Sequence, residues 1–363
     1  MLSPDAPGIL ELRVDSPSVR LYPAASPTIS DDIRLAAIAM TPGANSPSTP
    51  SICLLRGPLD DFLRYSRQEA SKWLIDIAHD ICDPAQQRGA LLVWKESPQQ
   101  WLPVSTTDPL TASIYRYDLP VGITVGLSKI SRRVRKSVTS ATGYPSTMGD
   151  RVKARDRSCW VSGVRGPLVN SHICPKRVGD HAARIIFCTF TSLPPSPDLS
   201  IYDEIFGLCL SNNLDAWFGT YEMGFRFVSP NNYECHMFTT EPAGWECTLL
   251  GSLPSPSAYP AVHGLQVRPP QPQLTNVPPP GLFRWHYLQC VLGRFAHDDY
   301  KNLENIYFYE LPLRMEGDSE DDGTDSEAEW PSKGLDLGRV VENSLEESTE
   351  RRRAVATWIS TTL

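Results

Sequence analysis

Two residues, His172 and Asp215, have side chains and surroundings suited to chemistry. The ordinary pKa of an imidazole lies close to neutral pH, so His172 could accept or donate a proton under working conditions. The carboxylate of Asp215 could bind a hard divalent cation such as Mg²⁺ or Mn²⁺. Whether the two side chains can act together depends on the elements that carry them.

The elements around these residues are two predicted strands and a helix. Residues 155–163 and 168–176 alternate or are apolar, with turn-forming residues between them, so we predict a β-hairpin that ends at His172. Further on, Leu214, Trp217 and Phe218 recur at helical spacing. Two strands followed by a helix would bring His172 close to the helix face around Asp215.

Plain structural interpretations stand beside the chemical ones. A histidine in a short apolar strand is often a packed structural residue, and a helical aspartate such as Asp215 often only faces solvent. We expect His236 and His286 to support packing, because each lies among apolar residues. No glycine-rich phosphate loop, nucleophile elbow or zinc-finger spacing indicates another chemistry.

The order of these segments resembles the HNH endonucleases that are common in fungal genomes. The resemblance rests on Arg155-Asp156-x-x-Cys159-x-x-Ser162-Gly163, on His172-Ile173-Cys174-Pro175, and on the segment 202–218. Residues 284–292 look like the helix that follows the nuclease module in those proteins. Together the similar segments cover about residues 150–240 and 282–296.

The resemblance implies a ββα-metal nuclease fold and assigns roles by position. His172 would be the general base that activates water against a phosphodiester, and Asp215 takes the place of the family's helical metal-binding histidine. Phe206 stands where the family has its central asparagine. The cofactor would be Mg²⁺ or Mn²⁺, and both Phe206 and Asp215 depart from the family pattern.

A block of positive charge precedes and overlaps this region. Residues 126–185 hold 13 basic and three acidic residues, so this part carries +10 while the rest of the chain carries −18. Such a block is typical of polyanion binding, although a solvated helix face or a nuclear-import signal would look similar. We assign nucleic-acid binding to Lys129, Arg132, Arg133, Arg135, Lys136, Arg155, Arg157, Lys176 and Arg177.

Composition favours folded blocks joined by extended segments. The chain has 363 residues and 33 prolines, each of which removes a backbone donor. Its nine cysteines are scattered and never form a CxxC pair, so we expect most of them to be buried as small apolar residues. No apolar run is long enough to span a membrane, and the first five residues lack the basic-then-apolar order that is typical of a secretory signal. We therefore expect an intracellular protein, nuclear or cytoplasmic.

We predict an α+β protein built around a ββα-metal nuclease-like module. A helix is expected near 59–82, a hairpin over 89–104, and a strand near 112–117. The predicted parts are an N-terminal α/β region (1–126), the HNH-like domain with its basic lead-in (127–240), a proline-rich linker (241–281), a C-terminal helical extension (282–314), an acidic segment (315–334) and a final helix (335–363).

Two functional hypotheses follow from this organisation. The first is a metal-dependent nuclease that hydrolyses DNA or RNA phosphodiester bonds, in which His172 deprotonates water beside a divalent ion. The second is a catalytically inactive descendant that binds nucleic acid or protein through the same scaffold. Phe206 and Asp215 are the residues that discriminate between the two hypotheses.

Overall fold

A computed structural model describes residues 8–15, 19, 51–66, 69–123, 125–130, 145–196, 198–239, 262–270 and 276–302 of the chain. The chain divides into two compact units, Met1–Pro312 and Leu313–Leu363, and every described residue belongs to the first. Within the described residues no helix is long and apolar enough to cross a membrane. The model has the mixed helices and strands of an α+β protein.

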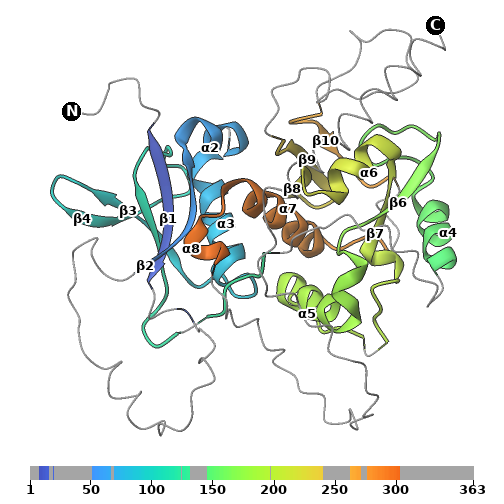
Figure 1. Cartoon of the computed structure of the whole chain (residues 1–363), viewed down its shortest axis with the longest axis horizontal. Helices are drawn as coiled ribbons and strands as arrows, with labels where there is room; N and C mark the ends of the chain where they lie inside the picture. Colours follow the sequence, from blue (N-terminus) through green and yellow to red (C-terminus); the bar gives the residue numbers. More distant parts are fainter. Residues whose placement is uncertain are drawn as a thin grey trace, which may run out of the picture. The chain divides into compact units, whose positions relative to one another are not determined.

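A five-stranded mixed sheet forms the N-terminal region, with strand order β2-β1-β5-β3-β4. Strands β1 and β5 run parallel, and the other neighbours are antiparallel. Helices α2 and α3 lie on one side of the sheet (Figure 1). The elements are β1 (Ile9–Asp15), β2 (Ser51–Pro58), α2 (Leu59–Ser66), α3 (Ala70–Cys82), β3 (Ala90–Lys95), β4 (Gln100–Pro103) and β5 (Ile114–Asp118).

Alternation along the strands explains which face of this sheet is covered. Leu10, Leu12 and Val14 of β1 are buried, whereas Glu11 and Arg13 between them are partly exposed. A period of two turns one face of a strand toward the core and leaves the other to polar side chains. The hairpin expected over 89–104 and the strand near 112–117 are confirmed, and the helix expected over 59–82 is present as two helices.

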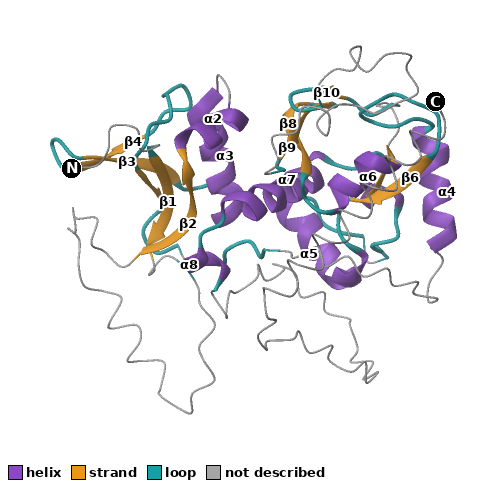
Figure 2. Ribbon diagram, turned by 45° about the horizontal axis from the view of Figure 1, so that its top comes forward, coloured by secondary structure: helices purple, strands orange, loops and turns teal. Residues whose placement is uncertain are grey.

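The second region covers the residues for which the nuclease-like module is predicted. It comprises α4 (Pro145–Asp156), β6 (Leu168–His172), a 3₁₀ turn η3 (Lys176–Val178), α5 (Gly179–Thr191), a 3₁₀ turn η4 (Glu204–Phe206), β7 (Gly207–Ser211), α6 (Asn212–Gly219), β8 (Met223–Ser229), β9 (Asn232–Met237) and β10 (Gln266–Val267). Strands β6 and β7 form an antiparallel pair, and β8, β9 and β10 form a three-stranded antiparallel sheet. Helix α6 packs against β6 (Figure 2).

The predicted hairpin over 155–172 is wrong in its first strand. Only β6 is a strand, and its partner is β7, which follows after α5. The segment after α4 runs instead through turns, closed by hydrogen bonds such as Gly163 N–H to the Cys159 carbonyl. Its apolar side chains serve as anchors: the buried Trp160 ring packs against Tyr233 and Phe283. A buried coil and a strand share the same apolar pattern, which explains the error.

Helix α7 (Pro280–Phe295) occupies the interior of the described unit. Twelve of its 16 residues are buried, on all sides of the helix, as expected for an element surrounded by others. It packs against α3, α5, β2 and β8. A hydrogen bond of 2.8 Å from Trp73 of α3 to the Tyr287 hydroxyl ties it to the N-terminal region. The short helix α8 (Asp298–Lys301) follows.

Several predicted segments fall partly or wholly outside the described residues. Of the basic lead-in to the HNH-like domain, residues 131–144 lie outside. Within the proline-rich segment 241–281, the described part contributes β10 and the start of α7. The acidic segment 315–334 and the final helix 335–363 also lie outside. Of the eight described cysteines, all but Cys188 are buried, which confirms the expectation for them.

Candidate functional site

His172 is the last residue of β6 and pairs in register with Gly207, the first residue of β7. Its side chain is half-buried. Asn170 lies two residues earlier on the same face of β6 and close to α4. The Asn170 Oδ1 atom and the Cε atom of Met148 in α4 both approach Gly207, since a Cβ atom built on that glycine would come within 2.5 Å and 2.8 Å of them. Because side chains repeat every second residue along a strand, His172 lies on the face of β6 that looks toward α4.

Asp215 lies in the first turn of α6 and is bonded to the neighbour of His172. The buried hydroxyl of Ser171 donates a 2.8 Å hydrogen bond to Oδ1 of Asp215. Ser171 and His172 are adjacent on β6, so their side chains leave the strand on opposite faces. The carboxylate of Asp215 is thus on the α6 face, and an ion shared with His172 would have to reach both groups around the end of the strand.

Phe206 is part of the hydrophobic core. Its side chain is 0% exposed, its N–H donates to the Asp203 carbonyl at 3.0 Å, and its carbonyl accepts from Ile173 N–H at 2.8 Å. An aromatic ring offers no oxygen or nitrogen to a cation. In the described part of the chain, no group of three or more His, Cys, Asp or Glu side chains is arranged to hold a metal ion.

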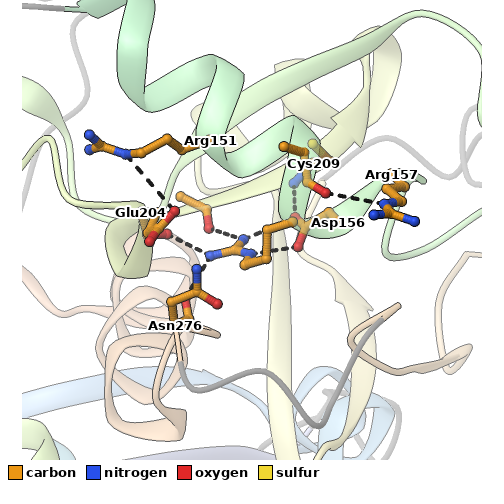
Figure 3. Close-up of polar contacts among 9 residues, drawn as sticks. Arg151, Asp156, Arg157, Glu204, Cys209 and Asn276 are labelled. Carbon is orange, nitrogen blue, oxygen red and sulfur yellow. Dashed lines mark hydrogen bonds and ion pairs between the residues drawn. The ribbon is translucent and has the colours of Figure 1, made fainter.

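The motif Arg155-Asp156 clamps the start of β7. The Asp156 carboxylate accepts a 2.8 Å hydrogen bond from the Cys209 N–H and binds the Arg155 guanidinium at 2.7 and 3.0 Å. Arg155 also donates to three backbone carbonyls, those of Glu204 and Gly207 at 2.7 Å and of Asn276 at 2.9 Å. Figure 3 shows Asp156, Glu204, Cys209 and Asn276 around this network.

These contacts change the role of Arg155. A guanidinium has five N–H donors, and all five are used here. The residue is only 4% exposed. The structure therefore places Arg155 in the interior as a structural clamp, where its donors are not available to a phosphate, rather than on the nucleic-acid surface for which we selected it.

Other predicted bases lie at the surface. Lys129, Arg157 and Lys176 are exposed, as are Arg151 and Lys153 of α4. Arg151 is partly engaged, because it donates to the Tyr202 carbonyl at 3.1 Å and lies 3.9 Å from the Glu204 carboxylate. The side chain of Arg177 and the whole of Arg132, Arg133, Arg135 and Lys136 are outside the described residues.

The two core histidines have structural partners. His286 is stacked on the Phe218 ring with centroids 3.7 Å apart, and its Nε2 lies 3.1 Å from the Phe218 carbonyl. His236 lies between the Tyr287 hydroxyl at 2.6 Å and the Glu234 carboxylate at 3.1 Å. Both are fully buried, so the expectation that they support packing is confirmed.

Two residues define the local geometry beyond the predicted site: Ser171, which was not singled out from the sequence, and Asp156, which was named only as part of a motif. Ser171 binds Asp215, and Asp156 binds the backbone of β7. Ser171 carries only the signal of a polar residue inside an apolar strand, next to the candidate base.

No protein-family model, curated protein or solved structure matches the chain.

Proposed function

We propose that residues 145–219 form a nuclease-type ββα module that binds nucleic acid without cleaving it. Support for the scaffold comes from the order of the elements: an antiparallel strand pair, β6 and β7, is followed directly by α6, with His172 at the end of the first strand. The resemblance to HNH endonucleases predicts that the general base lies at the end of the first strand, where His172 is found.

The proposal that the module does not cleave rests on the two residues at the expected metal site, Asp215 and Phe206. Asp215 stands where the HNH endonucleases have a metal-binding histidine, and one of its carboxylate oxygens accepts the hydrogen bond from Ser171. Phe206, which replaces an asparagine, is buried core. A catalytic metal ion would have only the carboxylate of Asp215 as a ligand from these two positions. Hydrolysis needs an ion that is held firmly beside the attacking water, so one carboxylate is a weak anchor for it.

Binding is supported by the charge around α4. Arg151, Lys153 and Arg157 are exposed on or just after this helix, and Lys176 is exposed after β6. No acidic residue lies between Arg157 and Lys176. Exposed bases attract phosphates and make the affinity depend on salt.

The test of binding is the salt dependence of affinity for a fluorescein-labelled 20-base-pair DNA duplex. Lys153→Ala with Arg157→Ala should flatten the slope of log affinity against log salt by about 2, since each phosphate contact contributes about 0.9. The matched control replaces Lys95 and Lys301, exposed bases outside the module, and should leave the slope unchanged. A separate variant of Arg132, Arg133, Arg135 and Lys136 measures their share. No binding at low salt would refute the proposal.

Hydrolysis is the second candidate, favoured by the half-buried position of His172 at the strand end. Plasmid nicking with Mg²⁺ or Mn²⁺ decides between the two. We expect the same background with the wild type and with His172→Ala. Robust cleavage that is lost in His172→Ala would establish a nuclease and show that Asp215 suffices as the metal anchor.

A further inference from the structure

The hairpin between β8 and β9 ends in two exposed apolar side chains. Phe227 is 36% and Val228 48% exposed, and the turn continues through Pro230 and Asn231, which are also exposed. Asn231 adopts a φ of 58°, which closes a tight turn. The pairing of β8 with β9 shifts in register between Phe227 and Ser229, so Val228 lies at an irregularity of the strand, next to Phe227 at the end of the hairpin.

The base of this hairpin is firmly packed. Phe227 pairs with Tyr233 across the strands, and their ring centroids are 6.0 Å apart. The ring of Tyr233 in turn contacts Phe283 of α7 at 4.7 Å and Trp160 at 6.3 Å. The exposed end is therefore carried by a rigid aromatic base, and Trp160 places the segment that follows α4 beside it.

The segments at this end of the sheet carry positive charge alone. No acidic residue occurs in 157–167, in 227–233 or in 266–270, whereas Arg157, Arg165 and Arg268 are exposed within them. Arg268 directly follows β10, whose pairing with β9 brings it opposite Asn232. Arg226, which precedes Phe227 in β8, is buried and bonded at 3.0 Å to Glu69, whose side chain is 59% exposed, so this pair adds no net charge beside the hairpin end.

We propose that the hairpin end, Phe227 and Val228, is a wedge that inserts into the base stack of a DNA duplex held by the surrounding arginines. The inference rests on the proposed nucleic-acid binding and adds how the duplex is engaged. Proteins that kink DNA combine these two features: apolar side chains enter between base steps while neighbouring arginines contact the phosphates or the minor groove.

The test uses the full chain and a 20-base-pair DNA duplex with 2-aminopurine at a central TA step. Opening the step should raise the 2-aminopurine fluorescence several-fold when the wild-type protein binds. Val228→Ser and, separately, Phe227→Ser should abolish the rise while the salt slope of binding remains. Leu193→Ser removes an equally exposed apolar side chain beyond the end of α5 and should keep the rise.

Three other outcomes overturn the proposal in distinguishable ways. Binding without any rise in fluorescence removes the wedge and leaves the nucleic-acid function intact. A rise that survives both serine variants shows that another part of the protein opens the duplex. Failure to bind the duplex at all removes the wedge together with the proposed function. Because Phe227 also packs on Tyr233, Val228→Ser is the decisive variant if Phe227→Ser unfolds.

Discussion

The hydroxyl of Ser171 donates a 2.8 Å hydrogen bond to the carboxylate of Asp215, which ties β6 to α6 directly beside His172. Hydrogen bonds to charged groups stabilise proteins by about 1.5–3 kcal/mol. The bond therefore gives Asp215 a structural role in joining β6 to α6. The size of this structural role can be measured as the contribution of the hydrogen bond to the free energy of unfolding.

Ser171→Ala should lower the free energy of unfolding by about 2 kcal/mol, since it leaves a partly buried carboxylate without its donor. Urea unfolding of Ser171→Ala, Asp215→Ala and the double variant measures the coupling energy, which we expect to exceed about 1 kcal/mol. A coupling close to zero would mean that the two groups stabilise the module independently. The structural role given to Asp215 would then fall.

Phe206→Asn should destabilise the protein by about 4 kcal/mol, because it removes a buried ring and places an amide in the core. The control, Phe206→Leu, keeps the site apolar and should cost under about 2 kcal/mol. Thermal or urea unfolding gives both values. A stable Phe206→Asn variant would contradict the packing described for this residue.

Replacing Arg155 and Arg157 by alanine should have very different effects on stability, although the two residues are only two positions apart. Arg155→Ala breaks a buried ion pair with Asp156 and orphans three backbone carbonyls, which should cost about 3–5 kcal/mol. Arg157 is exposed, so Arg157→Ala should change stability by less than about 0.5 kcal/mol while weakening DNA binding. Equal effects of the two variants on stability would contradict the clamp.

The contrast between these arginines shows where sequence reasoning stopped. Strand β6 with His172 and helix α6 with Asp215 could be predicted, because local apolar periodicity marks both. The partner of β6 could not, since Trp160 makes the segment after α4 look like a strand although its ring is an anchor in the core. Burial of Arg155 also depends on carbonyls from Glu204 and Asn276, which are distant in sequence, so its basic type alone suggested a surface role.

Helix α5 was not predicted either, although three of its buried residues, Ala183, Phe187 and Phe190, lie at helical spacing. This helix separates β6 from β7 in the chain, so without it the hairpin partner was sought upstream. The bond between Ser171 and Asp215 depends on how β6 and α6 pack, which no local pattern records. Local periodicity thus predicted the elements, and tertiary contacts decided which of their side chains meet.

Asp80 of α3 gives the protein a pH dependence of known sign. Burial raises the pKa of this carboxyl to about 6, although the adjacent Arg284 of α7, to which it is hydrogen-bonded, lowers it. The folded state therefore binds this proton more tightly than the unfolded chain, whose carboxyl titrates near pH 4. The free energy of unfolding should fall as the pH rises from about 4 to about 6, and this loss should amount to about 3 kcal/mol.

Asp80→Asn removes the titrating group, so the stability of the wild type relative to this variant should drop by that amount between pH 4 and pH 7. Urea unfolding at both pH values measures the difference, and the titration of His79, which both proteins keep, largely cancels. Asp76→Asn is the matched control, because it removes a half-exposed carboxylate from the same helix and leaves Asp80 in place. If the relative stability of Asp80→Asn stays constant across this range, the ion pair with Arg284 outweighs burial and Asp80 is ionised throughout.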